Sequence, residues 1–467
     1  MTVLELYEAC GRVGDLHCPS NRPVTGISRH TEHVSEGDIF FCRQGKIFDS
    51  HAVATELFSA GAAVVVGHQE LSFDGNYWRV DKGDEAKIAA AFYGHPSRRL
   101  KILGITGTDG KSTTAWITAQ LLKANGFSTA CLGTLGIWKG EGWQPWGFTT
   151  PEPEVLQKTF ADLVTEGFTH VVMEVSSHSL SSARVRGTQF TSVALTNLGR
   201  DHLDDYVSLE EYHAAKEMLF ALQKHPHFQV RPLSSPGVAY WQTGKNPKVT
   251  LIEAARNVQK IVIENEGKSW DCDFSLGGQH NLENLATSLG LLSTLAVDFD
   301  FLKNTLAHIK PLAGRWQWVE NTKQQVMVDY AHTPGALKTL LSNVRPLVKG
   351  ELKVLFGCGG NRDSEKRFLM GQEAHKLADI VYVTDDNPRD EDPDSIRAEI
   401  LRGAKGEGVN IADRHQAIET AINELNTDDI LVIAGKGHES GQVIKNEIKE
   451  FNDVTVVRKL WKQRHVG

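Results

Sequence analysis

A short glycine-rich loop at residues 107–113, GTDGKST, carries the residue types that bind phosphate. It follows the apolar segment KILGIT at 101–106 and precedes a segment with helical periodicity. Glycines let a backbone approach phosphates closely, and a helix N-terminus offers unpaired N–H groups. Lys111 could neutralise phosphate charge, and the Ser112 hydroxyl could reach Mg²⁺. The usual phosphate-loop spacing would place glycine where Ile105 stands, so the sequence predicts a shortened variant of that loop.

Acidic and imidazole side chains follow two further apolar segments. Glu174 lies near the end of HVVMEV and precedes His178, while SVALTNL at 192–198 precedes Asp201 and His202. In a parallel sheet covered by helices, ligands bind beyond the carboxyl ends of the strands. Two such strand ends near a phosphate loop suit a hard cation that bridges nucleotide oxygens. Taken singly, each of these residues is more typical of a solvated surface.

Three stretches of alternating strand and helix patterns must position these residues. In residues 1–98, the pattern predicts strands at GDIFFC and AAVVVG around a helix at HAVATELFSAG. In residues 99–309, the strand patterns KILGIT and HVVMEV alternate with KSTTAWITAQLLKANG and PEVLQKTFADLVTEG. Residues 310–467 repeat the alternation with ELKVLFGCGG, DIVYVT and DDILVIAG as strands. We therefore predict three α/β domains with largely parallel sheets, although residues 222–270 give only a weak pattern.

The composition argues against several other classes of protein. The 467 residues carry a net charge of -8, with 40% hydrophobic and 23% charged residues, which is typical of a soluble globular chain. The six cysteines form no CxxC pair, which disfavours a zinc ribbon or a disulfide framework. The N-terminus has no signal-peptide pattern, and no apolar run approaches the roughly 20 residues of a membrane span. We expect a cytoplasmic monomer that acts on small molecules, binds no nucleic acid and does not insert into membranes.

Ten segments of the chain, taken in order, resemble the Mur ligase family. They are GTDGKST at 107–113, MEVSSHSL at 173–180, LTNLGRDHLD at 195–204, YHAAKEMLF at 212–220, HNLEN at 280–284, AGR at 313–315, DYAHTP at 329–334, GCGGNRD at 357–363, DNPR at 386–389 and AGKGHE at 434–439. The resemblance runs from about residue 25 to the C-terminus. It implies three domains, a central ATP-binding domain with a parallel sheet and a Rossmann-like C-terminal domain.

The resemblance implies ATP and Mg²⁺ as cofactors and assigns residues to them. The ATP-binding residues would be Gly107, Thr108, Gly110, Lys111, Ser112, Thr113, Asn281, Asn284, Arg315 and Asp329. Mg²⁺ would be held by Ser112, Glu174, His202 and Lys216, and the catalytic residues would be Lys111, Lys216, His202 and Arg315. Lys216 would be carbamylated, whereas by composition alone it is typical of a surface lysine.

The resemblance also implies two further substrates. The residues that would bind a UDP-muramyl peptide are Thr31, Thr149, Thr150, Ser176 and Arg184. Those that would bind an amino acid are Arg362, Asp386, Asn387, Arg389, Gly435 and Glu439. The chain departs from the family pattern in four places: Thr31 provides the one hydroxyl in HTE where DSR is usual, Phe148 replaces Asn, Ser182 replaces Gln, and the segment after Lys216 lacks the usual NADD-like strand.

GCGGNRD, DNPR and GKGHE resemble the MurE-type branch, which adds the third amino acid to UDP-N-acetylmuramoyl-L-alanyl-D-glutamate. The implied reaction forms an acyl phosphate from ATP and then an amide bond in a peptidoglycan precursor. Arg389 suits a ligand carboxylate and favours meso-diaminopimelate over L-lysine, unless it merely pairs with Asp390 or Glu391. The alternatives are a Mur-like ligase for L-lysine or another peptide acceptor, a folylpolyglutamate synthase-like ligase, and a catalytically idle ATP-binding scaffold.

Overall fold

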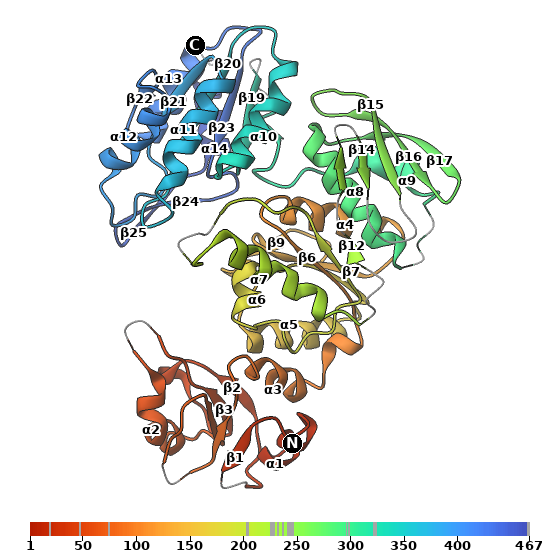
Figure 1. Ribbon diagram of the computed structural model, residues 1–467, viewed down its shortest axis with the longest axis vertical. Coiled ribbons are helices and arrows are strands. Elements are labelled where there is room, and N and C mark those ends of the chain that lie inside the picture. Colours follow the sequence, from red (N-terminus) through yellow and green to blue (C-terminus); the bar gives the residue numbers. More distant parts are fainter. Residues whose placement is uncertain are drawn as a thin grey trace. The chain divides into compact units, whose positions relative to one another are not determined.

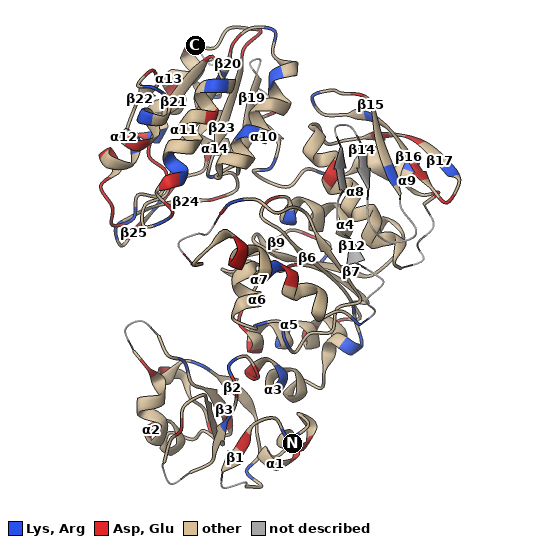
Figure 2. Cartoon of the chain, in the orientation of Figure 1, with Lys and Arg blue, Asp and Glu red and all other residues tan. Residues whose placement is uncertain are grey.

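The computed structural model describes most of the chain. The described residues are 1–17, 20–45, 48–72, 75–201, 205–224, 229–230, 233–235, 238–240, 247–295, 297, 299–320 and 325–464. They fall into two compact units, one of Met1–Thr106, Gly126–Val193 and Ala215–Gln229, the other of Gly107–Asn125, Ala194–Ala214 and Val230–Gly467. Both signs of charge are interspersed along the helices (Figure 2). Within the described ranges, no helix combines the length and the apolar character needed to cross a bilayer.

A five-stranded sheet in the order β1-β5-β4-β3-β2 organises the first hundred residues (Figure 1). Its strands are β1 Asp15–His17, β2 Gly26–Ser28, β3 Asp38–Phe41, β4 Val64–Gly67 and β5 Tyr77–Arg79. The helices are α1 Val3–Ala9, α2 Ala54–Ser59 and α3 Glu85–Phe92, with 3-10 turns at Thr31–His33, Ser50–Val53 and Pro96–Arg98. Ile39 and Phe41 pack on one face of β3, and Phe40 and Cys42 on the other. Burial of both faces explains the continuous apolar run by which this strand was predicted.

The central sheet has seven strands in the order β12-β11-β6-β10-β7-β8-β9. Its strands are β6 Lys101–Thr106, β7 Thr129–Gly133, β8 Gly136–Trp138, β9 Trp143–Gln144, β10 His170–Glu174, β11 Ser192–Leu195 and β12 Gln229–Val230. The associated helices are α4 Lys111–Ala124, α5 Pro153–Thr165, α6 Ser177–Ser181 and α7 Leu209–Ala221. β6 is parallel to β10 and lies between β10 and β11. The three strands whose ends carry the predicted chemistry are therefore neighbours in one sheet, as expected.

A separate antiparallel sheet occupies the segment whose sequence pattern was weak. It comprises, in chain order, β13 Leu233–Ser235, β14 Val238–Tyr240, β15 Lys248–Glu253, β16 Gln259–Asn265 and β17 Lys268–Phe274. It is followed by α8 Gln279–Ser293 and α9 Leu302–Thr305. In β16, buried residues such as Ile261 and Ile263 alternate with exposed or half-buried ones, because one face of the sheet meets solvent.

The last third of the chain contains a six-stranded sheet in the order β18-β19-β23-β20-β21-β22. Its strands are β18 Gln317–Trp318, β19 Gln325–Asp329, β20 Leu352–Phe356, β21 Ile380–Val383, β22 Val409–Asn410 and β23 Ile430–Ala434. The remaining elements are α10 Pro334–Val344, α11 Glu365–Leu377, α12 Pro393–Gly403, α13 Arg414–Asn423, the hairpin β24 Gly441–Ile444 with β25 Glu447–Glu450, and α14 Asp453–Arg464.

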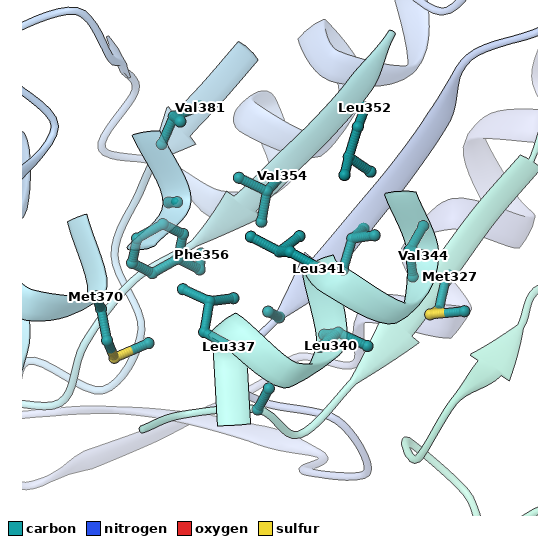
Figure 3. Packing of buried hydrophobic residues seen from close by; sticks show 14 of the residues in the cluster. Met327, Leu337, Leu340, Leu341, Val344, Leu352, Val354, Phe356, Met370 and Val381 are labelled. Atoms are coloured by element: carbon teal, nitrogen blue, oxygen red, sulfur yellow. The ribbon is translucent and has the colours of Figure 1, made fainter. Parts of the chain in front are cut away.

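Helices cover both faces of this sheet. On one face Leu337 and Leu341 of α10 pack with Val354 and Phe356 of β20 and with Met370 of α11 (Figure 3). The opposite face packs against α13 and α14. The predicted α/β alternation is therefore correct here, and it places the loops that follow β20, β21 and β23 at one edge of a parallel sheet.

Removing one partner of the buried Arg414–Asp453 ion pair should destabilise this region. Arg414 donates from Nε and Nη2 to the two oxygens of Asp453 at 2.8 and 2.9 Å, which joins α13 to the start of α14. Asp453→Ala would leave a buried guanidinium without its counter-charge, so we expect the free energy of unfolding to fall by about 3–5 kcal/mol. Urea unfolding followed by tryptophan fluorescence measures the change.

The control variant is Glu8→Ala, which removes the exposed pair between Arg12 and Glu8. Exposed pairs contribute little because water and salt screen them, so its unfolding midpoint should stay that of the wild type. Equal midpoints for Asp453→Ala and the wild type would contradict the prediction.

Candidate functional site: two adjoining cavities and a strand-end cluster

The phosphate loop connects the end of β6 to the first turn of α4. Gly107 and Gly110 have φ of +145° and +82°, backbone conformations that favour glycine. The ammonium of Lys111 folds back over the loop, with Nζ 3.0 Å from the carbonyl of Gly107 and 2.8 Å from that of Thr108. The loop thus presents a positive charge at the start of a helix, which suits an anionic ligand.

The residues that follow β11 hold this loop in place. The Thr196 hydroxyl donates to the Asp109 carbonyl at 2.6 Å. The side-chain oxygen of Asn197 accepts from the backbone N–H groups of Asp109 and Thr108 at 2.9 and 3.2 Å. The N–H of Gly199 donates to the Thr108 hydroxyl at 2.8 Å. The LTNLG segment therefore acts as a brace for the loop, a role that its sequence alone did not indicate.

A cavity of about 140 Å³ opens beside the loop. Six predicted nucleotide-binding residues line it: Gly110, Thr113, Asn281, Asn284, Arg315 and Asp329. Further lining residues, which sequence reasoning did not name for this site, include His280, Glu283, Thr287, Trp316, Tyr330, Thr339 and Leu340. The lining combines polar groups with aromatic and aliphatic side chains, as a nucleotide requires.

The two asparagines of this cavity form a hydrogen-bonded chain between helices. The Thr114 hydroxyl of α4 donates to Asn284 Oδ1 at 3.1 Å, and the Asn284 amide donates to Asn281 Oδ1 at 3.1 Å. The Asn281 amide in turn donates to the carbonyl of Gly277 at 2.7 Å. Each amide nitrogen carries a second hydrogen, so the predicted contact with a base stays compatible with this arrangement.

An imidazole and an indole lie together in this cavity. The rings of His280 and Trp316 are 5.1 Å apart. Burial lowers the pKa of His280 to about 4, so its ring is neutral at pH 7. An uncharged aromatic lining of this kind can accommodate a purine base without an opposing charge.

Arg315 and Asp329 bring charge to the same cavity. The Arg315 guanidinium lies 4.2 Å from the centre of the Tyr330 ring, and its Nη2 lies 3.5 Å from the Ser112 hydroxyl. The carboxylate of Asp329 accepts the N–H groups of Trp316 and Ala331 at 2.6 and 2.8 Å. Burial nevertheless raises the pKa of Asp329. Arg315 is thus placed to add a second positive charge next to the phosphate loop.

Glu174 is the centre of a cluster at the end of β10. It is 2% exposed, it lies opposite Ile105 of β6, and its two oxygens accept the backbone N–H and the hydroxyl of Thr134 at 2.9 and 3.2 Å. The hydroxyl of Thr150 donates to the Glu174 carbonyl at 3.0 Å and accepts the N–H of Ser176 at 3.1 Å.

Two more of the predicted peptide-binding residues join this cluster. The hydroxyls of Thr149 and Thr134 are 3.1 Å apart, and Arg184 donates to the carbonyl of Thr150 at 3.1 Å. Thr31 lies in an exposed 3-10 turn, and among the described residues no hydrogen bond ties it to the cluster. The structure therefore brings together four of the five residues predicted for the muramyl peptide.

A second cavity, of about 160 Å³, lies beyond the carboxyl ends of β20, β21 and β23. All six residues predicted for the amino acid line it: Arg362, Asp386, Asn387, Arg389, Gly435 and Glu439. Asp201 and His332 line it too, with His332 Nε2 3.6 Å from a carboxylate oxygen of Asp201. Tyr330 lines both cavities, so the two adjoin.

Arg389 is held at this cavity by its own backbone and by a neighbouring loop. Its φ is +54°, its N–H donates to the carbonyl of Val443 at 3.1 Å, and its Nη1 donates to the carbonyl of Gly360 at 2.7 Å. The nearby Glu391 pairs with Arg367 at 2.6 and 2.7 Å instead. In the described chain Arg389 forms no ion pair with Asp390 or Glu391, so the simple pairing considered from the sequence is wrong.

Comparison with known proteins identifies the family. The Mur ligase middle domain matches residues 105–292, and the Mur ligase glutamate ligase domain matches residues 314–437. This chain belongs to the Mur ligase family. The predicted family, the α/β three-domain architecture and the ligase class are thereby confirmed.

Several relatives of this Mur ligase cover almost its whole length. UDP-N-acetylmuramoyl-L-alanyl-D-glutamate–2,6-diaminopimelate ligase of Geobacillus kaustophilus is 35% identical over 96% of this chain and 97% of its own. The ligase of the same name from Mesorhizobium japonicum is 36% identical over 94% and 95%. A solved structure of a ligase of that name has a TM-score of 0.68 at 28% identity and covers 100% of this chain and 99% of its own. Folylpolyglutamate synthase of Mycobacterium tuberculosis has a TM-score of 0.61 at 16% identity, with 74% and 91% covered, and shares the fold.

Three of the four predicted metal ligands of this Mur ligase are buried, and the fourth lies outside the described residues. Lys216 lies on α7 and is 0% exposed, so it is not the surface residue that its composition suggested. His202 lies outside the described residues. Ser112 and Glu174 are buried hydroxyl and carboxylate groups that border the phosphate loop and the end of β10.

Replacing Lys111 with Ala should abolish most of the ATP-dependent activity of this ligase. The variant loses the ammonium that lies over the loop, and removal of one preorganised electrostatic group from such a site costs about a hundredfold or more in rate. Phosphate release from ATP measures the loss, and circular dichroism checks the fold.

The control is Lys123→Ala, which removes an exposed lysine from the last turn of the same helix. This variant should keep the wild-type rate. A Lys111→Ala enzyme with near-full activity would refute the assignment of the phosphate loop.

Proposed function

We propose that this Mur ligase adds meso-diaminopimelate to UDP-N-acetylmuramoyl-L-alanyl-D-glutamate, with ATP as the energy source, in the synthesis of a peptidoglycan precursor. One observation carries the proposal: the six residues predicted for the amino acid line a single cavity next to the nucleotide cavity. The relatives that bear this ligase name, and that align over nearly the whole chain, support it.

The first half of the proposed reaction is transfer of a phosphoryl group. A carboxylate oxygen of the muramyl peptide attacks the γ-phosphorus of ATP, the bond to the β,γ-bridging oxygen breaks, and ADP and an acyl phosphate result. Such a transfer depends mainly on positioning and on neutralisation of charge. Lys111 over the loop and Arg315 beside Ser112 supply two positive charges for this purpose.

The proposed Mg²⁺ prefers oxygen donors, and two of the four residues predicted to bind it carry such groups. Ser112 and Glu174 offer hydroxyl and carboxylate oxygens, which this hard cation prefers, and a carbamate on Lys216 would add more. His202, predicted as a fourth ligand, lies outside the described residues. When bound, Mg²⁺ would neutralise phosphate charge and orient the phosphate oxygens.

The second half of the proposed reaction joins the amino acid. Its amine nitrogen, after losing a proton, attacks the acyl carbon, and phosphate leaves with the electron pair of the broken C–O bond. In the second cavity Asp386 and Glu439 are acids that suit an ammonium, while Arg389 and Arg362 suit carboxylates. Because an acyl phosphate hydrolyses readily, placing the amine in a cavity that adjoins the nucleotide cavity favours attack by the amine over attack by water.

The choice of amino acid depends on the far end of the ligand. meso-Diaminopimelate carries a second carboxylate where L-lysine carries none. Arg389, not engaged by Asp390 or Glu391, can grip that carboxylate through two parallel hydrogen bonds. We therefore expect the wild-type enzyme to release phosphate from ATP when both the muramyl dipeptide and meso-diaminopimelate are present, and to use L-lysine poorly.

Arg389→Ala should lower this selectivity by about 2–5 kcal/mol, the cost of truncating one partner of a buried charge pair. The readout is kcat/KM for meso-diaminopimelate and for L-lysine, with KM for ATP measured in parallel and expected to stay constant. Arg402→Ala removes an exposed arginine from α12 of the same domain and serves as the control. A wild-type preference for L-lysine, or unchanged selectivity in Arg389→Ala, would refute the proposed substrate.

We also propose that Lys216 is carbamylated. A neutral amine forms a carbamate when its nitrogen bonds the carbon of CO₂ and loses a proton, which replaces a buried cation by an anion that can bind metal. Complete burial disfavours the ammonium of Lys216, and the carbamate anion would be stabilised by a cation beside it, such as the proposed Mg²⁺. Lys216→Ala should lose activity and regain part of it when a short-chain carboxylate is added.

Phosphate release with and without added acetate measures this rescue. Lys158→Ala, on the exposed side of α5, should neither lose activity nor respond to acetate. An unmodified Lys216 remote from any metal in an ATP-bound crystal would overturn the proposal.

A further inference from the structure

A buried lysine lies directly behind the acid end of the amino-acid cavity. Lys436 follows β23 and is 0% exposed. Its Nζ donates to Asn387 Oδ1 at 3.1 Å and to Glu439 Oε2 at 2.9 Å. The Asn387 amide donates to the same Glu439 oxygen at 2.9 Å. The three side chains therefore form a closed ring of hydrogen bonds.

Two of these three side chains face the cavity and the third lies behind them. Asn387 and Glu439 line the cavity, whereas Lys436 does not. The side chain of Glu439 is 31% exposed, so it faces the cavity while the ammonium stays behind it. A buried ammonium requires hydrogen-bond acceptors such as these oxygens. Each hydrogen bond restricts the orientation of the acceptor side chain as well as that of the lysine.

Lys436 fixes the orientation of both cavity residues. Asn387 Oδ1 accepts from Lys436 and from the N–H of Val443 at 2.9 Å, which turns the amide N–H group toward Glu439. Glu439 Oε2 accepts from both Lys436 and Asn387, which leaves Oε1 for a ligand. Beside Asp386 and Glu439, the buried Lys436 supplies one positive charge that offsets part of the charge of these two carboxylates.

We propose that Lys436 is a positioning residue for the incoming amino acid, which it serves by holding Glu439 and Asn387 in the orientation that receives a single ammonium group. The proposal rests on the proposed function, because it takes the second cavity as the amino-acid site. Lys436 acts through its two partners and does not itself contact the ligand.

The test is Lys436→Met, which keeps the length of the side chain and removes its charge and its donors. We expect KM for meso-diaminopimelate to rise by about tenfold or more, which corresponds to about 1.4 kcal/mol and lies near the lower limit for a hydrogen bond to a charged group. KM for ATP and KM for the muramyl dipeptide should change by less than about twofold, since neither site contains Lys436. Phosphate release at varied concentrations of each substrate gives the three constants, and Lys436→Gln, which retains a donor, should show a smaller increase.

Lys353→Met is the matched control. Lys353 is a second buried lysine, on β20, 2% exposed, with Nζ 3.2 Å from Asp429 and a hydrogen bond to the carbonyl of Glu424. Lys353 is not among the residues that line either cavity. Loss of this lysine should lower the unfolding midpoint and leave all three KM values unchanged.

The outcomes separate the inference from the proposed function. If wild-type enzyme shows no turnover with meso-diaminopimelate, the proposed function fails, and the KM shift is then measured with whichever amino acid sustains turnover. If KM for the amino acid is unchanged in Lys436→Met and Lys436→Gln, the positioning role is wrong. A uniform rise of all three KM values, as from general loss of stability, would overturn it as well.

Discussion

The phosphate loop is so closely packed at two positions that a Cβ there would collide with a neighbouring side chain, and the proposed nucleotide site is arranged around this packing. A Cβ at Gly107 would lie 1.9 Å from the Thr196 hydroxyl, and one at Gly110 would lie 2.5 Å from Asn284 Oδ1. Thr196 follows β11, and Asn284 belongs to α8. The loop before α4 therefore fixes how closely these two elements approach the start of that helix. In the proposed function Lys111 acts from this closely packed loop, which is what electrostatic stabilisation of a phosphoryl group requires.

Tyr330 links this frame to the second cavity. Its ring lies under the Arg315 guanidinium at 4.2 Å and within 4.6 and 5.1 Å of the rings of His332 and His438. Burial lowers the pKa of His438 to about 4, so that ring adds no charge at pH 7. Tyr330 therefore lies between the proposed phosphate site, which contains Arg315, and a cavity lined by side chains of both charges. This arrangement suits a reaction in which an activated acyl group forms on one side and an amine approaches from the other.

Sequence patterns predicted those elements whose formation depends mainly on residues close together in the chain. β6, the loop and α4 could be predicted because a buried strand, glycines and a helical period follow one another in 101–124. The antiparallel sheet from β13 to β17 could not, because its strands are short or half exposed and their apolar pattern is weak, although each strand pairs with the next one in the chain. The burial of Lys216 and the brace formed by Asn197 also depend on tertiary contacts, which composition and spacing do not encode. The residues that line the second cavity were found through family resemblance, since they come from three separate loops.

Buried cations behind that cavity show how those three loops are held together. Arg367 on α11 joins the loop after β20 to the loop after β21, because its guanidinium donates hydrogen bonds to the Gly359 carbonyl and to the Glu391 carboxylate. Lys436 ties the loops after β21 and β23, and Arg414 bonds the carbonyl of Ala434 at the end of β23. A buried ion pair contributes little net stability relative to well-packed apolar residues, so stability alone is a weak reason for Arg367, Lys436 and Arg414 to be buried here. Their common property is geometric: each joins a loop or strand end at the carboxyl edge of the sheet to another element. Directional hydrogen bonds donated by buried cations can hold such irregular backbone in one conformation. Apolar contacts alone do not specify that conformation.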